Sequence, residues 1–535
     1  MKKKVIVVLS IIILIIGIIS IIKYNKNKSK FNYTIEQISE VNYFLLMQNN
    51  KYGVINKNGD IVVDPIYDVV EIPNASKPVF ICKGNYDQNS GEYNIQVFND
   101  KKEPILYQYY TVEAIKLNNV ESNGNYEKSV LKYKSDNKYG LIDFSGNKIT
   151  DAEYDEISSL QDKYGEILVK KNNKYGVINI KGTQLVSCRY DYVKGDGFVK
   201  EGSYKYGGYI IGNKTKDGYI YGYVDKNEKE ILKMDNENVY RVTEINSDDA
   251  YIVASKNGRY ALYKNKENLT ENKYIDIYYN NGTNTFTVQK NKSFGLIDLS
   301  GNILIPEKYQ ELMVVGIYVK ASLDDVDYTF DLNGNEVENS KYASLEETTT
   351  GRFYISIDNN YKYGILDKDK NVVVENEYDY IEEIKSTGLL IATARDNITI
   401  YTGSINEVVS VEHAQLERVD NYIKVTTQNE MYYLTSDGKK VGNKTVYLEN
   451  NIYASKSEDK WGFVDLKDNV IVPYKYDEAT ELDEYGFAGI KKGGKWGVIN
   501  SNGDIILEPT YESDELSPVF IGKYCLKNGV ARDSI

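Results

Sequence analysis

Histidine and cysteine, which carry much of the nucleophilic, acid–base and zinc chemistry of proteins, are scarce in this chain of 535 residues. His413 is the only histidine, and Cys82, Cys188 and Cys525 lie far apart without a CxxC pair or a Cys/His cluster. The sequence therefore predicts neither a zinc site nor a disulfide framework, and the cysteines are interpreted as small buried side chains. Phosphate-binding and nucleophile motifs of the GxGxxG and GxSxG types are absent as well.

Carboxylates are abundant, yet no Asp or Glu pair stands out from the others as the acid and base of a glycosidase. The segment DKDKN, residues 367–371, is similar to the first half of a calcium-binding loop. Val372 takes the place of the glycine that such a loop requires, and Tyr378 stands where a bidentate glutamate is needed. We interpret this segment as an ordinary turn. The chain is therefore expected to be non-enzymatic, with no catalytic residue, no cofactor and no metal site.

The composition excludes some partners and favours strands. With 78 Asp and Glu against 65 Lys and Arg, the formal net charge is -13, so no concentrated basic surface is available to bind nucleic acid or anionic lipid. The 51 tyrosines favour strands over helices. Few prolines and many Ile, Asn, Lys and Tyr residues are consistent with an AT-rich coding sequence and a bacterial source.

An apolar segment at the amino terminus predicts a membrane anchor. Residues 5–22, VIVVLSIIILIIGIISII, lie between lysine-containing flanks and would form a helix about 27 Å long, close to the thickness of the hydrocarbon core. A cleavable signal peptide is the alternative, but no small-x-small cleavage site follows the apolar run. We expect residues 1–4 to be a cytoplasmic head, residues 5–22 a single spanning helix and residues 23–40 a polar stalk. Because a head of four residues most simply stays in the cytoplasm while the rest is exported, the bulk of the chain is expected to be extracytoplasmic.

One short pattern recurs through the rest of the chain. An aromatic residue is followed by glycine, two apolar residues and Asp or Asn, and degenerate copies occur near residues 94, 261, 329, 399 and 432. Successive centres are 30 to 46 residues apart and mostly near 35, which predicts about thirteen repeats over residues 41–535. The glycines of the clear copies are Gly53, Gly140, Gly176, Gly222, Gly295, Gly364, Gly462 and Gly497.

Each repeat is predicted to contain short strands joined by tight turns. In residues 487–513 the apolar segments FAGIKK, KWGVIN and DIILEP alternate with turn sequences, and Gly493-Gly494 joins the first two. The second turn, residues 500–503, begins with Asn and ends with Gly503, which suits a type I turn closed by a left-handed residue. Other repeats have Asp468, Lys370 or Glu228 at this closing position, at modest strain.

The glycine of the aromatic-glycine pair has a different role. Weak copies replace it with Ala261, Thr329 or Thr399, and a β-branched residue is costly at positive φ, so this position is expected to be extended backbone. Glycine is then explained by the close approach of a neighbouring ring or strand.

A tyrosine follows fourteen residues after most of these glycines. We interpret it as a packing ring at the boundary between repeats, with its hydroxyl bonded to backbone, and an exposed platform for sugar or peptide is the alternative. His413 falls in the same phase and is interpreted as a variant packing residue. The phased tyrosines are Tyr67, Tyr154, Tyr190, Tyr309, Tyr378, Tyr476 and Tyr511.

The pattern resembles the WG-repeat family of bacterial proteins, in which Lys-Trp-Gly precedes an apolar pair and Asp, then a turn, a strand and a Tyr-Asp pair. Residues 460–479, with Trp461, are the most similar copy, and residues 495–513, with Trp496, follow them. Most other copies have Tyr or Phe in place of Trp. The resemblance implies a tandem β-repeat protein of mostly unassigned function and brings no catalytic residues.

These observations predict an all-β chain of antiparallel meander repeats with propeller-like packing, in which thirteen blades suggest two rings; an open superhelix is the alternative. The predicted function is a membrane-anchored binding scaffold at the cell envelope, with an unknown protein or envelope glycan as partner. A glycan-binding module or wall-polysaccharide enzyme is the second hypothesis, and a structural spacer is the third. Any binding site is expected where repeats depart from the common pattern.

Overall fold

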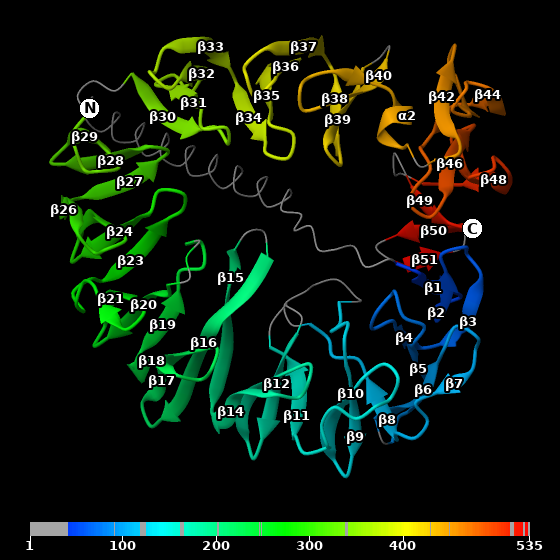
Figure 1. Cartoon of the computed structure of the whole chain (residues 1–535), viewed down its shortest axis with the longest axis horizontal. Helices are drawn as coiled ribbons and strands as arrows, with labels where there is room; N and C mark the ends of the chain where they lie inside the picture. The colour runs from blue at the N-terminus through cyan, green and yellow to red at the C-terminus, as the bar shows by residue number, and fades with distance from the viewer. Residues whose placement is uncertain are drawn as a thin grey trace, which may run out of the picture.

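The computed structural model describes residues 41–89, 91–117, 125–160, 165–200, 203–245, 247, 249–337, 341–427, 430–448, 450–513, 518–527 and 530–532. They form thirteen β-sheets arranged in one ring around a central opening (Figure 1). The predicted all-β fold of antiparallel meanders is confirmed, and its packing is that of a thirteen-bladed propeller. The expectation of two rings is wrong, because strands from the two ends of the described chain pair with each other and close a single circle.

The predicted head, anchor and stalk, residues 1–40, lie outside the described residues. In the part of the chain that the structure describes, no helix has the length and apolar character needed to cross a membrane. The helix that does occur there, α2 (Asn443–Val446), has four residues.

The β45–β48 sheet represents a regular blade. It comprises β45 (Glu478–Ala479), β46 (Phe487–Lys492), β47 (Lys495–Asn500) and β48 (Ile505–Tyr511), each antiparallel to the next. In the ring, the first strand of a blade faces the opening and the last lies at the outer rim (Figure 1). Alternate side chains therefore point to the two neighbouring blades, so both faces of each sheet are buried against another sheet.

The other blades repeat this order, some with three strands. The first six are β4 (Val69–Glu71), β5 (Phe80–Asp87), β6 (Glu92–Phe98), β7 (Pro104–Ile105); β8 (Thr111–Glu113), β9 (Leu131–Ser135), β10 (Lys138–Ile142); β11 (Glu156–Ser159), β12 (Glu166–Lys171), β13 (Lys174–Asn179), β14 (Gln184–Tyr190); β15 (Tyr192–Lys200), β16 (Ser203–Thr215), β17 (Gly218–Asp225), β18 (Glu230–Asn236); β19 (Asn238–Arg241), β20 (Tyr251–Lys256), β21 (Arg259–Lys264), β22 (Glu267–Asn268); and β23 (Asp276–Asn280), β24 (Thr285–Lys290), β25 (Ser293–Asp298), β26 (Ile303–Tyr309). The next five are β27 (Glu311–Val315), β28 (Tyr318–Leu323), β29 (Val326–Asp331); β30 (Tyr342–Glu347), β31 (Phe353–Asp358), β32 (Tyr363–Asp367), β33 (Val372–Tyr378); β34 (Tyr380–Ile384), β35 (Leu389–Ala394), β36 (Asn397–Tyr401), β37 (Glu407–Glu412); β38 (Gln415–Val419), β39 (Tyr422–Thr426), β40 (Met431–Leu434), β41 (Lys440–Val441); and β42 (Tyr453–Ser457), β43 (Lys460–Val464), β44 (Val470–Tyr476).

The ring is closed by a sheet that both ends of the described chain build. Its order is β3 (Ile61–Tyr67), β2 (Lys51–Asn56), β1 (Tyr43–Gln48), β51 (Val530–Arg532), β50 (Tyr524–Lys527) and β49 (Val519–Ile521). The contact between β1 and β51 is parallel, with Leu45 opposite Val530. Gly59 and Gly522 also meet closely, because a Cβ on Gly59 would lie 2.9 Å from the Cα of Gly522. Closure thus rests on backbone pairing between sequence ends rather than on a complete final repeat.

Two blades depart from the regular architecture. In the β15–β18 sheet, the first two strands have nine and thirteen residues, and the β15–β16 ribbon leans into the central opening (Figure 1). Pairing of β16 with β17 begins only at Gly208, so the ribbon extends beyond the rest of its sheet. The β42–β44 sheet has three strands, as the β8–β10 and β27–β29 sheets do, and differs from them because α2 precedes it in the chain.

Candidate functional site

The repeated glycine sits opposite a bulge in the outer strand. In the β45–β48 sheet, Trp496 pairs with Tyr511 but Val498 pairs with Leu507, so residues 508–510 bulge over Gly497. A Cβ on Gly497 would lie 2.5 Å from the carbonyl oxygen of Leu507, although the glycine itself does not have positive φ. The outer strand thus makes the close approach expected from the sequence. Carbonyl oxygens of the outer strand, or of residues 150–151 after β10 in the case of Gly140, would be 2.4 to 2.9 Å from a Cβ at Gly53, Gly140, Gly176, Gly222, Gly295, Gly364, Gly462 and Gly497.

The weak copy at Thr399 shows why glycine is dispensable there. Thr399 pairs with Ser410 and Ile398 with Val411, in a regular register without a bulge at this point. Without the bulge, the outer-strand residue that pairs with Ile398 therefore lies two positions earlier in the sequence than its counterpart in the bulged blades. His413 accordingly does not take the place of a phased tyrosine: it is exposed, has φ of 51° and follows the end of β37. The interpretation of His413 as a packing residue is wrong for this reason.

The phased tyrosines lie directly opposite the aromatic residue of the pair and pack on the following blade. Tyr476 pairs with Trp461 and is 1% exposed, in a cluster with Ala488 and Ile490 of the next sheet. Tyr511 pairs with Trp496 and meets Phe520 of β49 edge to face at 5.9 Å. The other phased tyrosines that contribute to such clusters are Tyr67, Tyr154, Tyr190, Tyr309 and Tyr378.

Two hydroxyls of this set bond to side chains of the next blade and not to backbone as expected. The hydroxyl of Tyr190 is 3.1 Å from Glu228 Oε1, and the hydroxyls of Tyr378 and Tyr401 are 2.7 Å apart. A hydroxyl at a boundary between sheets meets the side chains of the next sheet first, because the backbone of that sheet is already paired within it.

An ion pair also recurs with the repeat, and the sequence reasoning missed it. The lysine before the aromatic-glycine pair contacts the Asp that follows the phased tyrosine, seventeen positions later in most copies; Lys460 Nζ is 2.6 Å from Asp477 Oδ1. The second oxygen of Asp477 accepts the N–H of Gly493 in the next blade. The lysine lowers the pKa of the Asp477 carboxyl, with help from this N–H. Equivalent pairs are Lys51–Asp68, Lys138–Asp155, Lys174–Asp191 and Lys362–Asp379.

The residue that closes the turn before the outer strand touches the preceding blade. Where it is glycine, the turn lies close against that blade: a Cβ on Gly503 would be 2.9 Å from Val472. Where it is not glycine, the side chain reaches back instead, as Glu228 does to Ser187 Oγ at 2.6 Å and Lys370 to the Tyr318 ring at 5.6 Å. The residues at the repeat positions therefore serve packing within and between blades.

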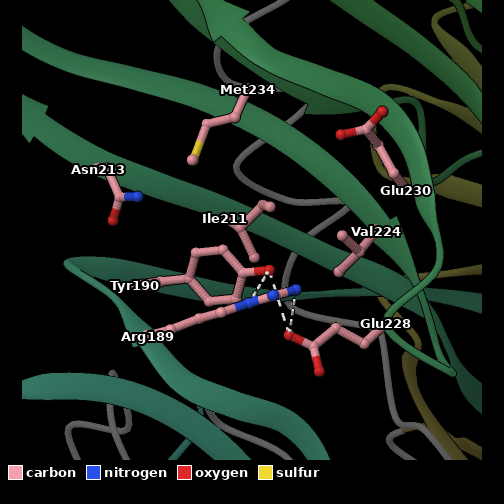
Figure 2. A pocket seen from close by; sticks show the side chains of 8 residues that line it. All are labelled: Arg189, Tyr190, Ile211, Asn213, Val224, Glu228, Glu230 and Met234. Atoms are coloured by element: carbon pink, nitrogen blue, oxygen red, sulfur yellow. Dashed lines mark hydrogen bonds and ion pairs between the residues drawn. The ribbon is translucent and has the colours of Figure 1, made fainter.

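The departures from this pattern are the remaining candidates, and the β15–β18 sheet has the most distinct set of groups. A pocket of about 290 Å³ lies between this sheet and β14 (Figure 2). Its lining combines the apolar side chains of Ile211, Val224 and Met234 with Arg189, Tyr190, Asn213, Glu228 and Glu230.

A buried polar group lies on the opposite face of the same sheet. Asp196 is 5% exposed, accepts a hydrogen bond of 2.7 Å from the Tyr223 hydroxyl and lies 3.8 Å from Arg241 Nε of the next blade. Burial raises the pKa of Asp196 to about 6, against the lowering effects of Tyr223 and Arg241. A Cβ on Gly208 would be 2.8 Å from the Tyr223 oxygen. These contacts fix the base of the β15–β16 ribbon.

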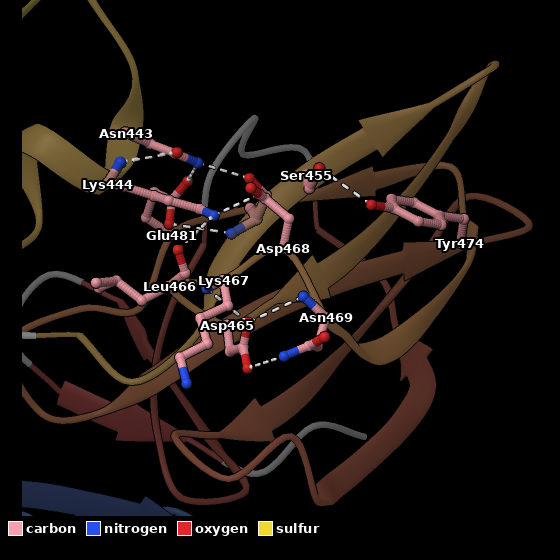
Figure 3. A network of polar contacts seen from close by, with 11 residues as sticks. Asn443, Lys444, Ser455, Asp465, Leu466, Lys467, Asp468, Asn469, Tyr474 and Glu481 are labelled. Carbon is pink, nitrogen blue, oxygen red and sulfur yellow. Dashed lines mark hydrogen bonds and ion pairs between the residues drawn. The ribbon is translucent and has the colours of Figure 1, made fainter.

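The second departure is a polar network around α2 (Figure 3). Asn443 Nδ2 donates to Glu481 Oε1 at 2.6 Å, and the N–H of Ala454 donates to the other carboxylate oxygen at 3.2 Å. Burial raises the pKa of Glu481 to about 7. Lys444 pairs with Asp468, the turn-closing residue of β43–β44. This network joins α2 to the two blades that follow it, β42–β44 and β45–β48.

The other residues singled out in the sequence have structural contacts. In the turn of residues 367–371, Asp367 Oδ1 accepts the N–H of Asn371 at 2.8 Å, and Asn371 Nδ2 donates to the other oxygen. Cys82 and Cys525 are buried and Cys188 is partly buried. Within the described ranges, no three His, Cys, Asp or Glu side chains are grouped to hold a metal ion.

Fold and repeat geometry together define a β-propeller whose blades share a recurring glycine, tyrosine and ion pair. The family model of the WG containing repeat matches residues 52–74, 139–175, 175–204, 461–496 and 496–513. These five matched segments are WG repeats, as the resemblance of the sequence to that family implied.

Similar solved structures share little sequence with this chain. They include the eukaryotic initiation factor (10% identity, 75% of this chain and 95% of that chain, TM-score 0.28), Sqt1 of Saccharomyces cerevisiae (9%, 62% and 96%, 0.20) and the WD40 domain of SCAP from fission yeast (11%, 62% and 98%, 0.19). Such TM-scores carry no argument about function. No curated protein matches the chain.

Proposed function

We propose that this chain is a non-enzymatic binding scaffold, held at a membrane by residues 5–22, whose propeller binds a protein or glycan partner of the cell envelope outside the cytoplasm. The membrane part of the proposal is supported by the apolar run and its lysine flanks. The binding part is supported by the fold, since propellers and other repeat arrays offer a broad surface that packing leaves free.

The observation that carries the proposal is the departure of the β15–β18 sheet from the other blades. Long ribbons cost conformational entropy, and a blade does not need them to pack on its neighbours. This sheet nevertheless has the longest strands among the described residues and a ribbon that reaches into the opening (Figure 1). A partner that contacts the ribbon would explain why the blade is longer than its neighbours.

The test is site-specific photo-cross-linking of the full chain in its native membrane. A photoreactive residue replaces Lys194 in β15, which is exposed and lies two residues before Asp196 at the base of the ribbon, or Tyr361 in the turn between β31 and β32, which is 70% exposed. We expect a reproducible cross-linked protein or glycan at Lys194 and none at Tyr361. Equal products at both positions, or none at either, would contradict the proposal.

Glycan binding is the second candidate because two exposed tyrosines outside the repeat pattern, Tyr192 and Tyr219, lie beside Tyr221 of the aromatic-glycine pair on the β15–β18 sheet. The rings of Tyr192 and Tyr221 are 5.5 Å apart, and those of Tyr219 and Tyr221 are nearly parallel at 6.0 Å. Tyr192 and Tyr219 are 36% and 42% exposed, so their faces are available for stacking on a sugar ring.

Replacement of both exposed rings distinguishes the two candidates. The double variant Tyr192→Ala, Tyr219→Ala is expected to lose sedimentation with cell-wall polysaccharide if a glycan is the partner, and to retain it if binding is unspecific. The matched variant is Tyr107→Ala, Tyr110→Ala, which removes two rings that are 83% and 88% exposed in the segment between β7 and β8.

A further inference from the structure

The pocket between β14 and the β15–β18 sheet contains an arginine that is fixed in place and still accessible (Figure 2). Arg189 Nε donates to the Tyr190 hydroxyl at 2.9 Å, and its Nη2 is 3.0 Å from Glu228 Oε1. Its guanidinium also lies 5.1 Å from the centre of the Tyr190 ring. The side chain is nevertheless 62% exposed. A guanidinium held in this way keeps its remaining N–H groups for a ligand at little further entropic cost.

Glu228 orients Arg189 and has little capacity left for a ligand. One carboxylate oxygen accepts bonds from the hydroxyls of Ser187 and Tyr190, and the other accepts the N–H of Ser187. Its φ of 60° places it where the related turns have glycine. Glu228, which departs from the repeat at a turn position that is glycine in several other copies, therefore holds in place the Arg189 guanidinium that gives this end of the pocket its positive charge.

Glu230 provides an opposite charge at the rim of the same pocket. It begins β18 and is exposed, and no Lys or Arg of the described residues forms an ion pair with it. Figure 2 shows Glu230 on the other side of Ile211 and Val224 from Asn213, and the floor between them is apolar. Ile211 and Val224 are 5% and 2% exposed as part of the core, and Met234 adds a flexible wall.

We propose that this pocket binds a zwitterionic α-amino acid with an aliphatic side chain. Arg189 binds its carboxylate, Glu230 binds its ammonium group, and Ile211, Val224 and Met234 contact the side chain. The volume of about 290 Å³ is at the lower limit of ordinary small-molecule pockets, about 300 Å³, which fits a ligand of this size. The inference goes beyond the scaffold function and does not depend on it.

The test measures binding of L-leucine to the full chain in detergent by isothermal titration calorimetry and by ligand-detected NMR. Two further probes each lack one charge: 4-methylpentanoate has the carboxylate and 3-methylbutylamine has the ammonium group. We expect saturable leucine binding at millimolar concentration and at least tenfold weaker binding of each single-charge probe. Absence of saturable leucine binding, or equal binding of all three probes, would overturn the proposal.

Variants assign the two charges separately. Glu230→Gln should weaken leucine at least tenfold while changing 4-methylpentanoate little, because only the ammonium group has lost its partner. Arg189→Gln should weaken both acids. Glu407→Gln is the matched control, since Glu407 is exposed and begins β37, as Glu230 begins β18. Because Glu230 bonds to no other described side chain, its variant keeps the test valid if Arg189→Gln disturbs folding; a Glu230→Gln protein that binds leucine normally would contradict the assignment.

Discussion

The β45–β48 sheet and the β15–β18 sheet share one strand order but use their residues differently. In the first, Gly497 lies under the bulge, and Trp496 and Tyr511 pack with Phe520. In the second, Gly222 has the same close approach, yet the sheet adds the ribbon, the buried Asp196 and the pocket. The comparison teaches that the residues of the repeat motif determine how blades pack, whereas residues outside the motif are free to serve binding.

The largest effect is expected where the regular sheet meets the closing strands. Phe520 is 1% exposed and packs with Trp496 and Tyr511. Phe520→Ala should lower the free energy of unfolding by about 4 kcal/mol, because it leaves a cavity at the ring closure. Hydrogen exchange should then increase in β45–β48 and β1–β3 before the β15–β18 sheet. Val519→Ala, at a position that is 41% exposed, is the control and should change stability by less than about 0.5 kcal/mol.

Titration of Glu481 tests the second departure, at α2. Burial raises its pKa from 4.5 to about 7, so the folded state binds the proton more tightly than the unfolded state. The stability from this group is therefore full below about pH 4.5 and is lost as pH rises through about 7, by on the order of 3 kcal/mol. Glu481→Gln should flatten this part of the dependence of melting temperature on pH from 4 to 8. An unchanged slope in the variant would exclude Glu481 as its source.

Gly497→Thr sharpens the comparison between bulged and regular outer strands. The new Cβ would meet the Leu507 oxygen at 2.5 Å, and we expect a loss of about 2 kcal/mol in urea denaturation. Thr399 shows that threonine itself is tolerated at this repeat position when no bulge lies opposite. Gly493→Asn is the control, because Asn49 and Asn172 begin the equivalent two-residue turns with positive φ. Equal stability of both variants would mean that the bulge does not require glycine.

The recurring ion pair should have the smallest effect. Lys460 and Asp477 are 50% and 38% exposed, so solvent screens their attraction. Lys460→Met should cost less than about 0.5 kcal/mol at moderate salt. A loss several times larger, measured by the same denaturation, would show that the pair holds neighbouring blades together rather than only orienting them.

Much of the blade could be predicted from the sequence because its geometry repeats. The alternation of apolar residues, the turn glycines and the phased tyrosines identify strands and boundaries between blades. The register of the outer strand is harder to predict from the sequence. The bulge adds residues to this strand in most copies, and nothing in the sequence around Thr399 indicates that the bulge is absent there. For this reason the sequence predicts a packing role for His413, whereas in the structure Val411 pairs with Ile398 at the corresponding position.

The contacts between blades were harder to foresee. The Lys460–Asp477 spacing is visible in several repeats, but only the fold brings the two side chains together. The role of Glu228 could not be predicted either. A non-glycine residue at this turn position indicates backbone strain, but it does not indicate that the side chain contacts Arg189. The single ring depends on the angle between neighbouring sheets and on pairing of β1 with β51, neither of which a repeat sequence specifies.

The central claim is that repeat residues stabilise the propeller and the β15–β18 sheet binds the partner. It is tested most directly by the amount of partner captured per folded molecule from native membranes with two variants. One is Gly497→Thr; the other replaces residues 198–205 with Asn-Gly, a two-residue turn between Gly197 and Tyr206, which are paired. We predict normal capture by folded Gly497→Thr and at least tenfold lower capture by the shortened ribbon at unchanged melting temperature. Normal capture by the shortened ribbon would contradict the claim.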